Sequence, residues 1–324
     1  MENNSVYLEK YMEIFHLLTL FERNISMKLP QTLSLISKCW LNAEQRVCKL
    51  ISTKYHAHNE VTITHLLYGE VKEEFDKINE NGTFARVFSK DLFAQFKDRK
   101  LADEVSRLSK GIIARISYHE PQMEIISGAD FGLAVVRPFF EKIREDRLKY
   151  TMQRQGLLCQ AKRQQFNGKL GQLTLHQMEV IPKHIAYFAL LLYLYRYSDR
   201  ERKNLLPFAW WHESTCDIDD IIDFLNNFDA EETVSSVDLI HSLGEGNIGT
   251  DDQDIINSII CPEELPYILV EITWRDGFPP KPPSGPRSGL SFETKNFENN
   301  LNTQKLVHRI IHHRRVQHVK TKTK

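Results

Sequence analysis

Asp130, Gln160 and Lys162 are the residues whose types and spacing most directly suggest chemistry. Asp130 stands in a Ser-Gly-Ala-Asp-Phe-Gly stretch, and Gln160 follows thirty residues later, separated from Lys162 by one residue. Both stretches adjoin apolar runs of strand character, so Gln160 and Lys162 are expected on one face of a strand. Phosphodiester hydrolysis requires a carboxylate that holds Mg²⁺, a second oxygen ligand and a nearby cation. The pattern therefore predicts a metal-dependent phosphodiesterase site.

Apolar runs bounded by glycine and proline are expected to form the strands that carry this site. Residues 131–136 and 156–159 have the composition of strands buried on both faces. Residues 267–274 form a further strong strand pattern, and residues 205–211 a weaker one. Between the first two strands, residues 141–155 are dense in charges of both signs and are expected to form a solvated helix or loop.

Four segments of the sequence are expected to form helices. Residues 5–55 show apolar positions at three- and four-residue spacing, with a break at residues 28–30. Residues 98–115 carry an amphipathic stripe, and residues 217–228 combine an N-cap, an acidic first turn and an apolar stripe. Residues 185–195 are apolar on nearly all sides but too short to cross a bilayer, which predicts a buried helix.

Composition limits the class of protein and of partner. The chain has 324 residues, with 42 Lys and Arg against 43 Asp and Glu. It therefore lacks the overall positive charge that would indicate a nucleic-acid-binding protein. Any such binding must come from a local patch. Acidic residues among the first thirty argue against a secretory signal, and a cytoplasmic protein without membrane association is expected. The five cysteines are scattered, which favours reduced thiols.

The order of helix, acid-bearing strand, polar-x-Lys strand and helix resembles the PD-(D/E)XK nuclease superfamily. The residues that carry this resemblance are Glu124, Gly128-Ala129-Asp130 and Gln160-Ala161-Lys162. Glutamine in place of the usual acid is similar to the Mrr-type restriction endonuclease branch. Residues 128–133, 156–163, 207–210 and 249–252 together look like an uncharacterised bacterial group of nuclease-like proteins associated with phage defence. The resemblance covers roughly residues 100–275.

The resemblance implies an α/β fold with a restriction-endonuclease-like core, a small mixed sheet flanked by helices, and a helical N-terminal region. It divides the chain into a mainly helical region at residues 1–95, a nuclease core at residues 96–275, and a Pro-rich linker with a basic tail at residues 276–324. The thirty-residue separation is long for the family and implies an insertion at residues 137–154.

The resemblance also implies roles for individual residues. Asp130 would be the principal ligand of Mg²⁺ or Mn²⁺, with Gln160 and a neighbouring backbone carbonyl completing the set. Lys162 would orient the attacking water or stabilise charge in the transition state. Because an amide is a weaker ligand than a carboxylate, a further acid is expected; Glu124 is favoured, and Glu104 is the alternative.

Basic residues are the candidates for contact with nucleic acid. Arg163 follows the polar-x-Lys stretch, and Arg314 and Arg315 lie in the basic tail, where each cation could bind phosphate. The tail could equally be a disordered solubilising end. Gln177 and Tyr187 follow in the next segment and could reach the site or only pack.

The expected function is Mg²⁺- or Mn²⁺-dependent endonucleolytic hydrolysis of DNA in restriction or phage defence. The alternative is a catalytically inactive module of nuclease fold that binds nucleic acid or a partner protein in a defence complex. Besides nucleic acid, the expected partner is either another protein of a defence system or a second copy of this chain in a homodimer. The two functions differ in one requirement, because only a nuclease needs its acids and Lys162 to converge on a single metal site.

Three other patterns in the sequence have simpler structural explanations. Residues 244–249 spell G-x-G-x-x-G, but the preceding residues make a poor buried strand, so a loop capped by residues 250–252 is expected rather than a dinucleotide site. Two groups have metal-ligand spacing but too few members for a site, and they are expected to be ordinary surface or core residues: His56 with His58, and His212 with Cys216.

Overall fold

The computed structural model describes residues 29–53, 60–119, 129–165, 168–197, 203–205, 208–211, 217–260 and 266–281. All of these residues up to Pro280 belong to one compact unit. Several residues named above lie outside the described ranges, among them Glu124, Arg314, Arg315, His56, His58, His212 and Cys216.

Helices make up the N-terminal part of the described chain, as predicted. They are α2 (Pro30–Thr53), α3 (Glu60–Glu80), α4 (Thr83–Phe96) and α5 (Ala102–Ser109), with a 3-10 turn, η1 (Arg99–Leu101), before α5. The predicted break at residues 28–30 agrees with the start of α2 at Pro30, because proline suits the first turn of a helix; residues 1–28 lie outside the described ranges. None of the helices in the described ranges is long and apolar enough to span a membrane.

The prediction of a single helix over residues 98–115 is wrong. The helix ends at Ser109, and strand β1 (Ile112–His119) begins three residues later. Gly111 has a φ of +72°, a left-handed conformation that reverses the chain between the two elements. Helical periodicity therefore identified the buried stripe of α5 correctly but extended it into a strand rich in β-branched residues.

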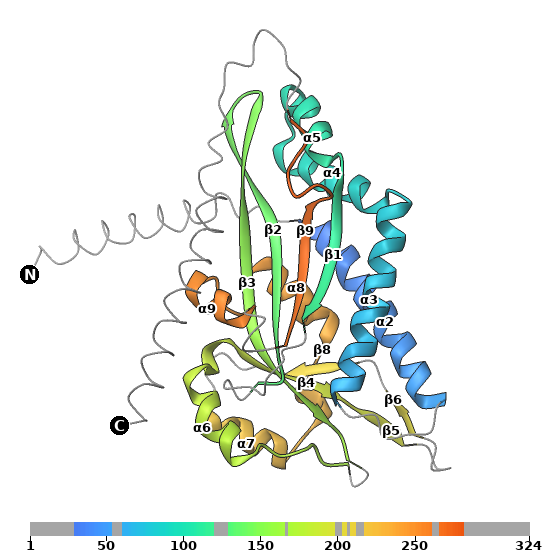
Figure 1. The fold of residues 1–324 in the computed structure, drawn as a ribbon, viewed down its shortest axis with the longest axis vertical. Helices are drawn as coiled ribbons and strands as arrows, with labels where there is room; N and C mark the ends of the chain where they lie inside the picture. The colour runs from blue at the N-terminus through green and yellow to red at the C-terminus, as the bar shows by residue number, and fades with distance from the viewer. Residues whose placement is uncertain are drawn as a thin grey trace, which may run out of the picture. The chain divides into compact units, whose positions relative to one another are not determined.

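A mixed sheet of seven strands forms the centre of the molecule (Figure 1). Its order is β1-β9-β2-β3-β4-β7-β8, where the further strands are β2 (Phe131–Arg144), β3 (Arg147–Arg163), β4 (Phe188–Tyr193), β7 (Ala209–Trp211), β8 (Val234–Ser235) and β9 (Tyr267–Trp274). β2 and β3 are antiparallel, whereas β4 runs parallel to β3 and β9 parallel to β2. A separate two-stranded sheet pairs β5 (Tyr195–Tyr197) with β6 (Lys203–Leu205). The predicted mixed sheet with flanking helices is confirmed at this level.

The charged residues 141–155 do not form the predicted solvated helix or loop. They form the outer half of a long β2–β3 hairpin, in which Glu141 pairs with Lys149 and Val135 with Gln155. The sequence Leu-Lys-Tyr-Thr-Met-Gln at residues 148–153 alternates covered and exposed side chains, which is the period of a strand. The hairpin accounts for the thirty residues between Asp130 and Gln160.

The predicted buried helix at residues 185–195 is also wrong. Residues Ile185–Tyr187 form one 3-10 turn, η3, and Phe188–Tyr193 form strand β4, in which every residue is buried. β4 lies between β3 and β7, and helices cover both faces of the sheet there, so its run is apolar on both sides. An apolar run of this length does not distinguish a central strand from a buried helix.

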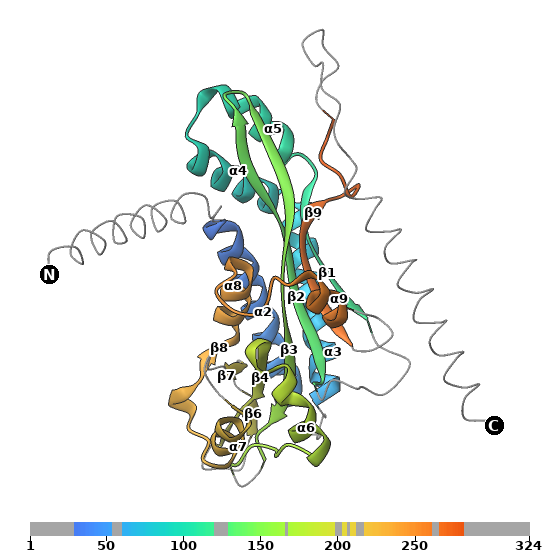
Figure 2. The same ribbon diagram turned by 90° about the vertical axis from the view of Figure 1, so that its left-hand side faces the viewer.

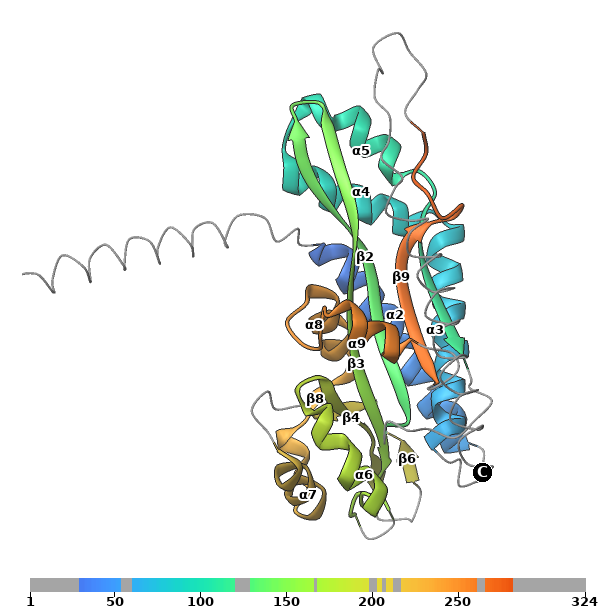
Figure 3. The ribbon, with the colours of Figure 1, turned by 60° about the vertical axis from the view of Figure 1, so that its left-hand side comes forward.

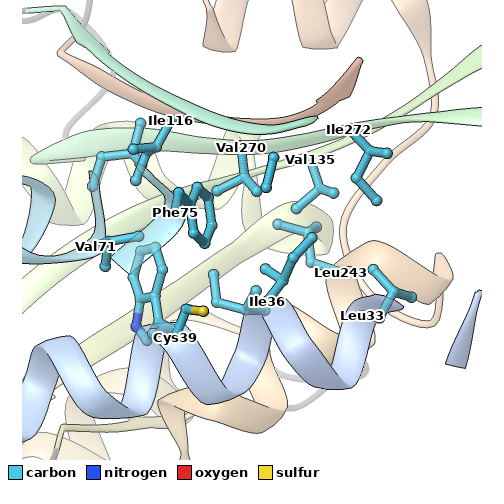
Figure 4. Close-up of a cluster of buried hydrophobic side chains, with 14 of the residues drawn as sticks. Leu33, Ile36, Cys39, Val71, Phe75, Ile116, Val135, Leu243, Val270 and Ile272 are labelled. Atoms are coloured by element: carbon cyan, nitrogen blue, oxygen red, sulfur yellow. The ribbon is translucent and has the colours of Figure 1, made fainter. Parts of the chain in front are cut away.

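Helices cover the sheet in two layers. On one face, α2, α3, α4 and α8 (Ser236–Glu245) enclose a large apolar cluster; Figure 4 shows Ile36 and Phe75 directed toward Val135 and Val270 of the sheet. On the other face, α6 (Leu175–Val180), α7 (Ile218–Asn226) and α9 (Gln253–Ile259) cover a second cluster (Figures 2 and 3). Gln160 and Lys162 belong to this second face, because successive strand residues alternate sides and Cys159 and Ala161 pack in the first cluster.

The elements expected near the C-terminal part of the described chain are largely confirmed. Asp217 caps α7 with a capping box, and β9 spans the predicted residues. Of the weaker candidate at residues 205–211, only Ala209–Trp211 is strand β7, while Leu205 ends β6.

The G-x-G-x-x-G stretch has a structural explanation. Gly246 ends α8 with a φ of +80°, and Gly249, with a φ of +81°, lies so close to β3 that an added Cβ would stand 2.6 Å from the carbonyl oxygen of Gly156. Thr250 and Gly156 exchange two backbone hydrogen bonds, of 2.8 and 3.0 Å. Asp252 then caps α9, so the predicted capped loop is confirmed and its glycines serve the close approach of two backbones.

Candidate functional site

Asp130 and the pair Gln160 and Lys162 meet at one end of the β2–β3 hairpin. Asp130 immediately precedes β2, and because β2 and β3 are antiparallel, the start of β2 lies beside the end of β3. The Asp130 N–H donates to the carbonyl oxygen of Cys159 at 2.9 Å and so extends the strand pairing by one residue. The backbone thus brings together the acid and the lysine that the sequence pairs.

The Asp130 carboxylate accepts two hydrogen bonds on the same oxygen. The Ala161 N–H donates to Oδ2 at 2.7 Å, and the Gln160 side-chain amide donates to the same atom. None of the hydrogen bonds between described residues uses Oδ1. Burial raises the pKa of Asp130 above its ordinary value, although these two donors and Lys162 act in the opposite direction.

Lys162 is a buried cation with only 7% of its surface exposed. Its ammonium donates to the carbonyl oxygen of Gln172 at 2.9 Å and to Oε1 of Gln177 at 3.5 Å. Burial lowers the pKa of Lys162, and the negative charges of Asp130 and Glu60 partly offset this effect. Two neutral oxygens hold the ammonium, and it interacts with Asp130 through space.

Gln177 reaches the site, which decides one of the alternatives left open by the sequence. It is the third residue of the α6 capping box with Thr174, and its Nε2 donates to Oε1 of Gln160 at 3.0 Å. Tyr187, by contrast, forms a 2.6 Å hydrogen bond with Nδ1 of His184.

Neither candidate for the extra acid is seen at the site among the described residues. Glu124 lies outside the described residues, and Glu104 forms an ion pair of 2.7 Å with Arg107 on its own helix. Glu60, which the sequence pattern does not indicate, acts electrostatically on both Asp130 and Lys162. Seventy residues separate it from Asp130, and the only local signal is an acid that opens an amphipathic helix.

Glu60 is held near the site by the first turn of α3. Thr64, one turn farther along, shares a 2.6 Å hydrogen bond with the hydroxyl of Tyr193, and Thr64 Oγ1 also lies 2.9 Å from the Glu60 carbonyl oxygen. Tyr193 ends β4 and pairs with Arg163 beside Lys162. The start of α3 is therefore fixed at the strand ends that carry the site.

Arg163 lies at the end of β3 and is half-buried. Strand alternation places its side chain on the face opposite to that of Lys162. Its predicted contact with nucleic acid stays a prediction, as do those of Arg314 and Arg315.

The donors at this site suit a hard cation, which prefers oxygen ligands and keeps several waters. Asp130 has a carboxylate oxygen that the described hydrogen bonds leave unused, and Glu60 adds a second negative charge that acts on Asp130 electrostatically. Across the described ranges, however, no three or more His, Cys, Asp and Glu side chains are grouped closely enough to hold a metal. The described residues therefore supply few protein ligands, and water would complete the coordination of any cation bound at Asp130.

Comparison of this chain with models of protein families, with curated proteins and with solved structures found no match.

Proposed function

We propose that this protein is a metal-dependent nuclease that hydrolyses phosphodiester bonds of DNA, with a role in restriction or phage defence. The observation that carries the proposal is that Asp130 and Lys162 lie at one end of the β2–β3 hairpin, where Gln160 and Gln177 connect them by hydrogen bonds and Glu60 acts on both electrostatically. An acid and a cation that interact through space in a partly dehydrated site suit the binding and hydrolysis of a phosphate diester.

Each side chain has a role in this proposal. Asp130 and Glu60 would hold Mg²⁺ or Mn²⁺, and the bound ion would supply Lewis acidity and an activated water. Lys162 would stabilise the negative charge that develops on the phosphate oxygens. Its ammonium is suited to this role because neutral oxygens hold it, so no carboxylate in direct contact cancels its charge.

The arrangement of the strands supports a restriction-endonuclease-like core as part of the proposal. The β2–β3 hairpin carries the acid and the lysine, α6 follows, and β4 returns parallel to β3. One feature departs from a simple succession of neighbouring strands, because β9 lies between β1 and β2.

The second candidate is an inactive module of the same fold that binds nucleic acid or a partner protein. One observation favours it: the described residues include no cluster of three or more potential metal-ligating acids, histidines and cysteines. In this case the site would bind phosphate through Lys162 without cutting it.

Cleavage of defined substrates tests the proposal. Purified protein is incubated with supercoiled plasmid, linear duplex DNA and single-stranded RNA, each with Mg²⁺, with Mn²⁺ or with a chelator. We expect metal-dependent cleavage of DNA. Binding of the DNA without cleavage in both metals supports the inactive module, and cleavage that the chelator does not abolish contradicts a metal-dependent site.

A pair of acid variants tests the role of Glu60. Glu60→Gln should lower kcat by about a hundredfold and raise the Mg²⁺ concentration needed for half-maximal rate, because a neutral amide binds the cation more weakly. Glu104→Gln is the matched control, and we expect its rate to stay within about threefold of the native rate because Glu104 pairs with Arg107 on its own helix, α5. A larger loss of rate in Glu104→Gln than in Glu60→Gln would instead identify Glu104 as the extra acid.

A further inference from the structure

A continuous line of hydrogen bonds connects Asp130 to α6 through two glutamine side chains. Gln160 donates to Asp130 and accepts from Gln177, which in turn accepts from the backbone N–H of Thr174 at 3.0 Å and from Lys162 at 3.5 Å. Gln160 is only 2% exposed, so water has little access to its amide. The orientation of each amide is therefore decided by the neighbouring protein groups.

The direction of this line is fixed at its ends. A backbone N–H and an ammonium can only donate, so the oxygen of Gln177 must face Thr174 and Lys162. The NH₂ group of Gln177 must then face Gln160, whose own oxygen accepts this bond. Gln160 is left with its NH₂ group directed at Asp130, which as a carboxylate can only accept.

This arrangement conflicts with the expected role of Gln160 as a metal ligand. The amide oxygen that would bind a cation is occupied by Gln177, and the amide group that faces Asp130 is the NH₂ group, which repels a cation. Turning the amide would place its oxygen against the Asp130 oxygen and its NH₂ group against that of Gln177. Both ends of the line would then lose a hydrogen bond inside the protein.

We propose that Gln177 is a positioning residue that fixes the Gln160 amide as a donor to Asp130 and holds the Lys162 ammonium, so that Gln160 acts through Asp130 rather than as a metal ligand. Oδ2 of Asp130 is held in place by Gln160 and Ala161, which leaves Oδ1 for the cation. The kinetic consequence of this assignment rests on the proposed function, whereas the orientation of the amides does not.

Gln177→Glu separates the positioning role from a structural one. The new carboxylate can still accept from Thr174 and Lys162, so the α6 capping box and the contact with the ammonium persist, but it cannot donate to Gln160. We therefore expect a melting temperature close to that of the native protein. Gln172→Ala is the matched control, because Lys162 binds the backbone carbonyl of Gln172, which this variant keeps.

The first measurement needs no activity. In protein labelled with ¹⁵N at glutamine side chains, the Gln160 amide resonances, identified by their loss in Gln160→Leu, report exchange of their protons with water. Gln177→Glu should accelerate this exchange at least about tenfold, the effect of one lost hydrogen bond, whereas Gln172→Ala should leave it unchanged. Unchanged exchange in Gln177→Glu would overturn the proposal.

The second measurement is the cleavage rate. Gln177→Glu should lower kcat by about tenfold, because Asp130 is no longer held by Gln160, while KM for DNA stays nearly constant. A native kcat with accelerated exchange would show that the position of Gln160 does not matter for catalysis and would also overturn the proposal. If the native protein cleaves no substrate, the nuclease function fails, and the exchange measurement alone decides the orientation of Gln160.

Discussion

Asp130 and Glu44 are both carboxylic acids inside the protein, but they lie in different surroundings. Glu44 is on α2 with no exposed surface; it accepts from Nε1 of Trp40 at 2.8 Å and from the hydroxyl of Ser236. Burial raises the pKa of Glu44 to about 8, so it carries a proton at neutral pH. Asp130 is partly exposed, and a cation, a backbone N–H and an amide surround it.

The difference shows which features of a buried acid indicate chemistry. Burial raises the pKa of both groups, so a raised pKa alone does not mark an active site. Each acid keeps one carboxylate oxygen outside the described hydrogen bonds, but neutral donors hold Glu44 and tie α2 to α8, whereas Asp130 also interacts with the charge of Lys162. The accompanying cation, rather than the burial, distinguishes the candidate site.

The largest effect is expected from removal of that cation. Lys162→Met keeps the length of the side chain and loses its charge, so kcat for DNA cleavage should fall by about a thousandfold, while the free energy of unfolding changes little. Single-turnover cleavage and urea denaturation measure the two quantities. A native cleavage rate in Lys162→Met would show that the neighbouring cation is not what distinguishes Asp130 from Glu44.

Glu44 should instead control how stability depends on pH. Its pKa rises from an ordinary 4.5 to about 8 on folding. Between these values the unfolded chain releases the proton that the folded protein keeps, so the free energy of unfolding falls by about 1.4 kcal/mol per pH unit from this group. The contribution is complete below pH 4.5 and has been lost once the pH passes about 8.

Glu44→Gln removes this dependence, because an amide does not titrate in that range. The difference in free energy of unfolding between native protein and variant should therefore change by a few kcal/mol between pH 4.5 and about 8, in favour of the variant as pH rises. Urea denaturation across this range measures it. A difference independent of pH would show that Glu44 is ionised in the folded protein.

The smallest expected effect concerns the donors around Glu44. Ser236→Ala should lower the free energy of unfolding by about 1 kcal/mol, since it removes one hydrogen bond to the buried acid. Ser37 is equally buried on α2, but among the described residues its hydroxyl has no hydrogen-bond partner, so Ser37→Ala should be neutral or stabilising. Equal losses in the two variants would show that the Ser236 bond contributes nothing.

The sequence predicted the parts of this structure that depend on local patterns. The helix start at Pro30, the capped helix after Asp217 and the strand at residues 267–274 follow from side-chain chemistry within a few residues. The pairing of Asp130 with the polar-x-Lys stretch also succeeded, because strand ends flanked by apolar runs leave few other arrangements.

Features that depend on tertiary contacts could not be predicted in this way. The apolar run of β4 is a strand only because β3 and β7 pair with it, and nothing within the run expresses that pairing. Glu60 acts electrostatically on Asp130 and Lys162, because Thr64 fixes the start of α3 at the end of β4. The role of Gln177 depends on the polarity of hydrogen bonds that join α6 to β3.

The assignment of the site to Asp130 is tested by the rates of metal-dependent DNA cleavage of Asp130→Asn and Glu44→Gln, measured beside the native protein with Mn²⁺. Each substitution replaces an acid by its amide of the same shape. We expect Asp130→Asn to lose cleavage by about a thousandfold or more and Glu44→Gln to keep the native rate. Native cleavage by Asp130→Asn would contradict the assignment of the site.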